Sequence, residues 1–303
     1  MILSASRRTD IPALYSDWLF EQIKNGYFLV PSPLIETGKI AKIKVEPVKV
    51  HTNILGGREV SGNVDGIVFW TKNPRPMMAR LDELKDFIYV FLFTLNAYDE
   101  KIEKQVPSLD ERIKTFQELS QKIGTDKVIW RYDPIFLNKE IDIEWHIKNF
   151  RNLASQLNGF TKICHIAFLI EGKCKNLKTP DYLQMNEILK NLSQIAREHE
   201  IQLFACAQKC DWSKYGIKSS KCIDPDFWSK LLGAKVKTKR LDGTRKNCGC
   251  MPCVDIGIYN TCTHGCLYCY ANGFYGYRGE PKSMSDKLDG EIYERKSERI
   301  FEY

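Results

Sequence analysis

Three cysteines close to the end of the sequence form its clearest chemical pattern. Residues 261–273 read TCTHGCLYCYANG, so three residues separate Cys262 from Cys266 and two separate Cys266 from Cys269. Cysteine thiolates bind zinc and iron–sulfur clusters, and a closed site of either kind usually has four of them. A four-iron cluster held by only three thiolates keeps one iron open to a small molecule. The spacing therefore indicates a metal cluster that can bind a further ligand.

Most of the other cysteines lie just before this segment. The chain has 11 cysteines, and nine of them fall between Cys206 and Cys269. A disulfide framework is disfavoured, because we expect the protein in the reducing cytosol and a chain of 303 residues needs no covalent staples. We instead predict a second iron–sulfur cluster or a structural zinc ion. The candidate ligands are Cys206, Cys210, Cys222, Cys248, Cys250 and Cys253.

The remaining cysteines and the histidines give weaker signals. Cys164 lies inside an apolar run, where a thiol packs as a small apolar group, and Cys174 stands alone. None of the five histidines has the spacing of a metal-ligand pair. His264 lies within the cysteine segment, where it either hydrogen-bonds a cluster sulfur or is an ordinary loop residue.

Short apolar runs alternate with helical patterns along the chain. The runs are rich in β-branched and aromatic residues and are apolar on both faces, as in buried parallel strands. We expect strands at 1–6, 66–71, 87–95, 127–133, 162–170, 201–207 and 254–260. We expect helices at 11–26, 109–124, 143–159 and 182–200. This order predicts an α/β fold built on a parallel β/α barrel, open or partial and TIM-like.

Polar and charged side chains follow most of these strands. In parallel β/α folds, chemistry gathers where the carboxyl ends of the strands meet the loops that follow them. We therefore expect catalytic groups at the ends of three strands: Lys72, Arg131, Asp133 and Glu171. The glycines between 53 and 66 match no phosphate-binding pattern, so we expect a hairpin or loop there.

The cysteine spacing, with aromatic Tyr268 directly before the last thiol, resembles the cluster motif of radical SAM enzymes. The resemblance implies a four-iron four-sulfur cluster whose open iron binds the amino and carboxylate groups of S-adenosylmethionine. One electron from a reductant such as flavodoxin or ferredoxin would cleave the sulfonium and release a 5'-deoxyadenosyl radical. Because auxiliary clusters are common in such enzymes, a cluster is favoured over zinc for the second thiol set. The implied cofactor-binding residues are Ser6, Arg7, Arg8, Asp10, Asn96 and Tyr268.

The position of the motif departs from that family. Radical SAM proteins commonly carry it after their first strand, whereas here it follows the last expected strand, 254–260. A circular permutation reconciles the two, with 254–260 as the counterpart of the first strand and 1–6 as that of the second. The SRRTD segment then lies beside the cysteines, and Asp10 either binds S-adenosylmethionine or caps the helix that starts at Ile11-Pro12.

The whole chain also resembles a family of bacterial and archaeal proteins of unknown function. The shared segments are SRRTDIPA near the start, WTKNP at 70–74, 132–134, and the cysteine array of 248–271. The resemblance supports the fold and the cluster and supplies no substrate. We divide the chain into a barrel core at 1–207, a basic cysteine-rich insertion at 208–253, and a final segment at 254–303 that completes the barrel.

Charge is concentrated in one part of the chain. Between Lys209 and Lys246 there are eleven Lys or Arg and four Asp, an excess of seven that equals the net charge of the whole chain, +7. This segment is either a solvated surface or a phosphate-binding one, which suggests a nucleic acid or a phosphorylated metabolite as substrate. The start of the chain lacks the pattern of a signal peptide, and no apolar run is long enough to span a bilayer, so we expect a cytoplasmic protein without membrane contact.

Three classes of function fit these features. The first is a radical SAM-like enzyme that acts on an unknown substrate. The second is an iron–sulfur electron-transfer protein, whose clusters would be closed by four ligands. The third is a zinc-bearing protein that binds nucleic acid through the basic segment. The polar groups that end six strands favour the enzyme, and the sequence does not predict an oligomeric state.

Overall fold

The computed structural model describes residues 1–31, 39–52, 58–170, 176–206, 210–237, 248–271, 291–295 and 300–302. Its centre is an eight-stranded sheet in which every pairing is parallel. The strands, in their order across the sheet, are β11 (Lys218–Ser220), β10 (Gln202–Cys206), β9 (Ile163–Phe168), β8 (Val128–Ile135), β7 (Tyr89–Thr94), β6 (Gly66–Thr71), β1 (Ile2–Ala5) and β13 (Cys253–Asp255). The predicted α/β fold with a large parallel sheet is confirmed.

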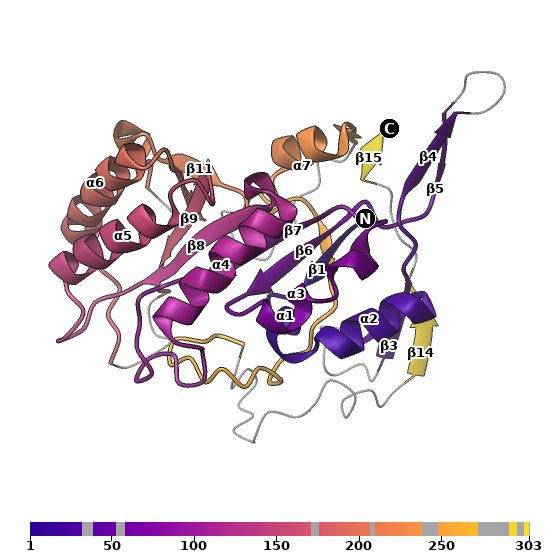
Figure 1. The fold of residues 1–303 in the computed structure, drawn as a ribbon, viewed down its shortest axis with the longest axis horizontal. Coiled ribbons are helices and arrows are strands. Elements are labelled where there is room, and N and C mark those ends of the chain that lie inside the picture. Colours follow the sequence, from indigo (N-terminus) through magenta and orange to yellow (C-terminus); the bar gives the residue numbers. More distant parts are fainter. Residues whose placement is uncertain are drawn as a thin grey trace.

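The order of the strands is that of a barrel rather than of a doubly wound sheet. From β1 to β11 each strand of the sheet lies beside its neighbour in the chain, so all crossovers are of one kind and the helices gather on one face. Figure 1 shows α4 (Leu109–Ile123), α5 (Ile143–Leu157) and α6 (Tyr182–Glu198) together on the near face. Among the described strands no pairing joins β11 to β13, so the sheet is open where a barrel would close.

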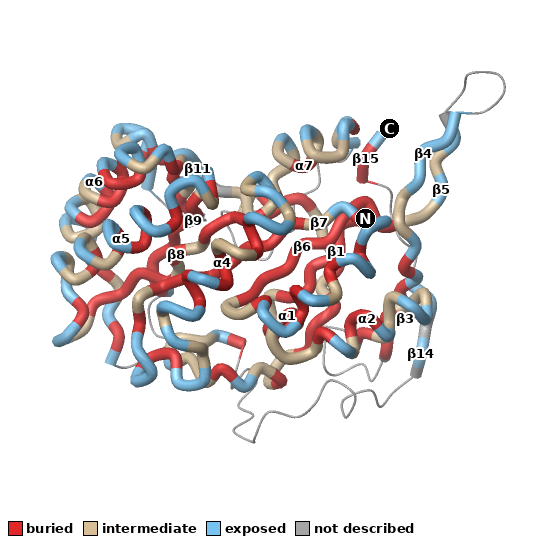
Figure 2. Tube along the Cα trace, in the orientation of Figure 1, coloured by how far each residue is buried: buried red, intermediate tan, exposed pale blue. Residues whose placement is uncertain are grey.

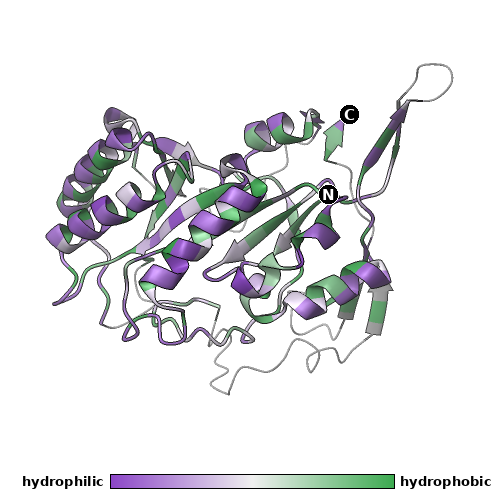
Figure 3. Cartoon of the chain, in the orientation of Figure 1, coloured by the Kyte–Doolittle hydropathy of each residue, from purple (hydrophilic) through white to green (hydrophobic). Residues whose placement is uncertain are grey.

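Six of the seven expected strands are present, because each has the apolar side chains that the sheet buries. The strand expected at 254–260 was misplaced: β13 covers only Cys253–Asp255, and the chain leaves the sheet after Asp255. Every residue of β6 is buried, and α5 packs on β8 through Phe150, whose ring stacks on Trp130 with centroids 4.8 Å apart. Cys164 on β9 is fully buried, as expected of a structural thiol. Buried residues follow the central strands in Figure 2, and the same strands are mostly hydrophobic in Figure 3.

The helix expected at 11–26 is broken into two. α1 (Ile11–Leu14) ends at Tyr15, whose φ of −137° leaves the helical region, and α2 (Ser16–Asn25) begins directly after it. The Tyr15 hydroxyl donates to the Thr261 carbonyl at 2.6 Å, so the break brings this part of the chain to the cysteine segment. Two shorter helices complete the set described here, α3 (Arg75–Met78) and α7 (Pro225–Leu232).

Smaller sheets lie at the margin of the central one. β2 (Tyr27–Pro31), β3 (Lys39–Lys44) and β14 (Glu291–Glu294) form one of them, and β12 (Lys235–Val236) pairs with β15 (Phe301–Glu302). β4 (Lys49–Thr52) and β5 (Arg58–Ser61) form the expected hairpin, which projects from the body in Figure 1. The two strands after residue 290 thus pair outside the central sheet. Within the described parts, no helix is long and apolar enough to cross a membrane.

Candidate functional site

The cysteine segment lies at the carboxyl edge of the central sheet and borders a cavity of about 240 Å³. Residues in the carboxyl-terminal halves of β6, β7, β8 and β9, or after β1, β6, β9 and β13, contribute to its wall. The polar lining includes Ser6, Arg7, Arg8, Thr9, Asp10, Lys72, Thr94, Arg131, Asp133 and His264, together with Cys222, Cys248, Cys250, Cys262, Cys266 and Cys269. The edge predicted from the strand ends is therefore a real concave site, and thiols from two parts of the chain open onto it.

The three thiols of the cysteine segment lie within electrostatic reach of one another. Burial raises the pKa of Cys262 to about 12, with further contributions from Asp10 and from the other two thiols. Burial likewise raises the pKa of Cys266 to about 12, although nearby Lys72 acts in the opposite direction. As free thiols Cys262 and Cys266 are protonated. A bound metal would displace the protons and supply the positive charge that three crowded thiolates need.

A second thiol group consists of Cys222, Cys248 and Cys250. Hydrogen bonds with Cys222 and Cys248, followed by burial, raise the pKa of Cys250 far above its usual range. Cys222 lies in the turn after β11, so the group joins chain segments about 26 residues apart in sequence. The sulfur of Cys253 accepts a hydrogen bond from Arg7 Nη2 at 3.5 Å. Cys210 is exposed, and the side chain of Cys206 lies outside the described residues.

A metal site requires several ligand atoms at set distances from one centre. In the part of the chain that the structure describes, no three His, Cys, Asp or Glu side chains are arranged to hold one metal ion. A structural zinc ion would require four ligand atoms about 2.0–2.3 Å from a single centre. A multi-iron cluster instead binds its thiolates on separate irons, which keeps the sulfurs farther apart. Both thiol sets therefore supply donor atoms of the kind that iron–sulfur clusters and zinc ions share.

Asp10 caps α1, as one of its two interpretations predicts. Its Oδ1 accepts a hydrogen bond from the Ala13 amide at 3.1 Å. Its Oδ2 accepts from the Lys72 amide at 2.7 Å and lies 2.8 Å from Nε2 of His264. Both carboxylate oxygens thus have protein partners, and one of these partners is the histidine of the cysteine segment. The Asp10 carboxylate therefore joins the ends of β1 and β6 to that segment.

The arginines of the SRRTD segment are held by the strand that precedes the cysteines. Asp255 on β13 accepts hydrogen bonds from the Ser6 hydroxyl and from the Arg7 amide, the latter at 2.8 Å. Arg8 Nε lies 3.9 Å from the same carboxylate, and its guanidinium lies 5.1 Å from the ring centroid of Tyr259. The predicted proximity of this segment to the cysteines is confirmed.

The four residues expected to be catalytic have different surroundings. Arg131 forms an ion pair with Asp133. The guanidinium groups of Arg131 and Arg7 lie 5.0 Å and 5.2 Å from the ring centroid of Trp70. Lys72 lines the cavity but donates from Nζ to Glu103 at 2.7 Å. Glu171 lies outside the described residues. Lys72, Arg131 and Asp133 thus line the cavity together, and each of them already forms an ion pair with another side chain.

Asn96 has a structural place behind the cavity wall. Its side chain accepts from the Asp133 amide at 3.0 Å and donates to the Asp133 carbonyl at 3.0 Å. It is fully buried and is not among the lining residues. The amide of Asn96 therefore orients the chain at Asp133, and the cofactor contact implied for it stays a prediction.

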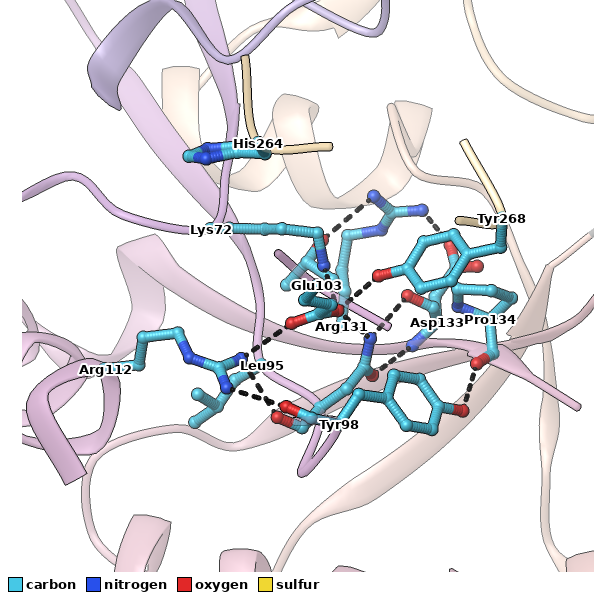
Figure 4. Close-up of polar contacts among 12 residues, drawn as sticks. Lys72, Leu95, Tyr98, Glu103, Arg112, Arg131, Asp133, Pro134, His264 and Tyr268 are labelled. Atoms are coloured by element: carbon cyan, nitrogen blue, oxygen red, sulfur yellow. Dashed lines mark hydrogen bonds and ion pairs between the residues drawn. The ribbon is translucent and has the colours of Figure 1, made fainter. Parts of the chain in front are cut away.

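Two features of the site carry no recognisable sequence signal. Glu103 lies under the cysteine segment, where it contacts Lys72, Arg112 and Tyr268 (Figure 4). It comes from a charged stretch, 99–112, in which no spacing distinguishes it from its exposed neighbours. The second feature is Thr9, a residue of the cavity wall whose buried hydroxyl has no hydrogen-bond partner among the described residues.

Comparison with known proteins identifies a family. Residues 2–271 match the model of the family described as "Domain of unknown function (DUF1848)". Since the match covers most of the 303 residues, the chain belongs to that family. No curated protein and no solved structure matches the chain. The family description assigns no activity, so function has to be inferred from the chemistry of the site.

Proposed function

We propose that this member of the DUF1848 family is an iron–sulfur enzyme of the radical SAM type with a circularly permuted order of strands. One observation carries the proposal. The thiols of Cys262, Cys266 and Cys269 border the same cavity as the charged residues that end the central strands. Chemistry in parallel β/α folds occurs at this edge, and a cluster bound there would have its open iron facing the cavity.

The sheet order supports the permutation. β13 pairs in parallel with β1, and Ile2 lies opposite Cys253. A cysteine loop that leaves β13 therefore emerges beside the loop that leaves β1, which is the neighbourhood required if β13 and β1 correspond to the first and second strands of the radical SAM fold. The continuous order from β1 to β11 supports the same assignment, because it gives a singly wound sheet with one functional edge.

The side chains around the cavity have the chemistry to hold S-adenosylmethionine. The guanidinium of Arg7 is suited to pairing with a carboxylate, and the buried hydroxyl of Thr9 can hydrogen-bond a ligand. The apolar side chains of Phe168 and Leu169 form another part of the wall and exclude water from it. Cys262, Cys266 and Cys269 would hold the cluster, which would supply one-electron chemistry: the electron, delivered by a flavodoxin or ferredoxin, would split S-adenosylmethionine into methionine and a 5'-deoxyadenosyl radical.

Two other functions remain less well supported. An electron-transfer protein would need clusters closed by four ligands, and a cavity lined by charged residues has no role in it. A zinc-bearing nucleic-acid-binding protein would need a single-ion site, which the described residues lack. We propose a nucleic acid or a phosphorylated metabolite as the substrate only from the basic segment 209–246, of which 238–247 lie outside the described residues.

Anaerobic reconstitution with iron and sulfide tests the proposal. We expect a brown protein whose reduced cluster gives an EPR signal that changes on addition of S-adenosylmethionine, and 5'-deoxyadenosine as a product after reduction. Cys266→Ala should lose this cluster, whereas Cys210→Ser, which removes an exposed thiol, should retain it. A reconstituted protein whose EPR signal ignores S-adenosylmethionine and which forms no 5'-deoxyadenosine would refute the enzyme and leave electron transfer.

A further inference from the structure

A buried ion group lies directly beneath the cysteine segment (Figure 4). The side chain of Glu103 is 1% exposed, and its two oxygens face Lys72 Nζ at 2.7 Å and Arg112 Nη1 at 3.1 Å. Asn96 Nδ2 lies 3.3 Å from the first of these oxygens. Burial alone would raise the pKa of Glu103, but the charges of Lys72 and Arg112 outweigh burial and lower it. The carboxylate is therefore ionised.

The same carboxylate reaches the cysteines through Tyr268. The Tyr268 hydroxyl donates to Glu103, and Tyr268 lies between Cys266 and Cys269 in sequence. Glu103 also pairs with Cys266 through a backbone bridge. Glu103 thus connects the buried ions to the loop that carries the proposed cluster ligands.

The backbone fixes the same two segments to each other. Glu103 forms an antiparallel bridge with Cys266, and the Leu267 amide donates to the Ile102 carbonyl at 2.9 Å. The Gln105 amide donates to the His264 carbonyl, also at 2.9 Å. These backbone bonds set the path of the cysteine loop, and the Tyr268 hydroxyl fixes a side chain that lies between Cys266 and Cys269 in sequence.

The ion group also determines the charge next to the cavity. Two cations, Lys72 and Arg112, and one carboxylate, Glu103, leave one net positive charge. Lys72 lines the cavity, and its Nζ lies 5.4 Å from the ring centroid of Tyr268. Interactions between charges are strong in such a buried place, because little water screens them. A cluster bound by three thiolates carries negative charge, so this arrangement favours it and places charges of both signs close to it.

We infer that Glu103 is a positioning residue for the cysteine loop, and that the ion group of Lys72, Glu103 and Arg112 tunes the cluster that we propose on this loop. Glu103 orients Tyr268 and, through it, the loop that carries Cys266. It also offsets one of the two buried cations, so that the net charge beside the loop is one rather than two. The second part of the inference rests on the proposed function, and the first does not.

Alkylation of the metal-free protein tests the positioning role without any cluster. The rate at which iodoacetamide modifies Cys266 is measured by peptide mass spectrometry, with exposed Cys210 as the internal reference. We expect Glu103→Gln and Tyr268→Phe to raise the relative rate at Cys266 at least several-fold. The matched control is Glu140→Gln, which removes an exposed carboxylate 3.5 Å from Lys101 in the same region of the chain. Unchanged Cys266 rates in Tyr268→Phe, which keeps the buried ion group intact, would overturn the positioning role even if Glu103→Gln failed to fold.

The reduction potential of the reconstituted cluster tests the electrostatic role. Removing a negative charge stabilises the reduced, more negative cluster, so Glu103→Gln should raise the midpoint potential, and Lys72→Met should lower it. Both variants break the same ion pair, so a merely structural loss would move the potential in one direction or not at all. Shifts of opposite sign support the inference, and shifts of equal sign or none overturn it. If the wild-type chain takes up no iron, the proposed function fails and the electrostatic part of the inference fails with it, while the alkylation rates still decide the positioning part.

Discussion

The hydroxyl of Ser4 donates a hydrogen bond to Oδ2 of Asp255 at 2.8 Å, although the two residues are 251 positions apart. The same carboxylate accepts hydrogen bonds from the amide of Arg7 at 2.8 Å and from that of Gly257 at 3.0 Å. It therefore ties the end of β1 to the end of β13. The loop that carries the arginines and the loop that carries the cysteines leave the sheet from this junction.

Replacing Asp255 with alanine is expected to destabilise the metal-free protein. The substitution leaves the Ser4 and Ser6 hydroxyls and two backbone amides without this acceptor, and hydrogen bonds to a charged group contribute about 1.5–3 kcal/mol each. Because contacts on one group are not additive, we expect a loss of about 3 kcal/mol in the free energy of unfolding, measured with urea. The control Asp126→Ala breaks an exposed pair with Lys162 and should cost less than about 1 kcal/mol. Equal losses in the two variants would show that Asp255 is no anchor.

Gly257→Ala should also destabilise the junction, for a steric reason. A Cβ at this position would lie 2.0 Å from the Ser6 hydroxyl oxygen and 2.5 Å from Ser6 Cβ. Overpacking of this kind costs about 1–3 kcal/mol in the free energy of unfolding. In the double variant with Ser6→Gly these two contacts disappear, so its loss should be smaller than the sum of the two single losses. Strict additivity would mean that the two residues do not press on each other.

The parts of the fold that follow from local patterns could be predicted from the sequence. Six of the seven apolar runs became strands because a strand buried on both faces must be apolar throughout, whereas most of 254–260 is not strand. The place of Asp10 before Ile11-Pro12 indicated a helix cap. β11 was missed because its three residues, KSS, are polar, and it is only an edge strand. The break at Tyr15 was missed because its cause is tertiary, a hydrogen bond to Thr261.

The site could be predicted where its residues are close in sequence and not where they meet only in space. The spacing of Cys262, Cys266 and Cys269 indicated one thiol group. Cys222 and Cys250 were expected in one second set, but nothing in the sequence distinguished Cys222 from Cys206 and Cys210 or predicted the contact of Cys253 with Arg7. Glu103 and Tyr268 are 165 residues apart, so no local pattern could pair them. The hydrophobic pattern of the sequence also could not predict whether the barrel closes, since closure depends on how β11 and β13 lie in space.

Acid should weaken the fold through His146. Its ring is fully buried, Nε2 lies 2.8 Å from the Phe136 carbonyl and Nδ1 lies 2.8 Å from the Tyr132 hydroxyl. A carbonyl can only accept, so Nε2 carries the proton and Nδ1 accepts from the tyrosine. Burial lowers the pKa of His146 from 6.5 to about 4, so between these values the unfolded chain binds a proton that the folded chain does not.

The free energy of unfolding falls as the pH falls wherever the unfolded chain binds more protons than the folded chain. As the pH falls from about 6.5 to about 4, His146 should remove about 3 kcal/mol from the free energy of unfolding, and below about 4 it should remove no more. Carboxylates contribute their own slope, so the measurement is the difference between wild type and His146→Gln in urea unfolding across this range. His51→Gln, at an exposed position on β4, is the control and should follow wild type. A His146→Gln profile parallel to that of wild type would contradict the prediction.

The second thiol group should bind metal through Cys222, Cys248 and Cys250 and not through Cys253. Cys250 hydrogen-bonds both of its partners, and all three thiols open onto the cavity, whereas the Cys253 sulfur accepts from Arg7. If this group holds a second cluster, Cys250→Ala should lose about half of the iron and sulfide of the reconstituted chain, because each four-iron site needs its thiolates. Cys253→Ala should keep nearly all of it. Elemental analysis that finds zinc lost from Cys250→Ala with iron unchanged would replace the cluster by zinc, and equal iron loss in the two variants would show that Cys253 is a ligand after all.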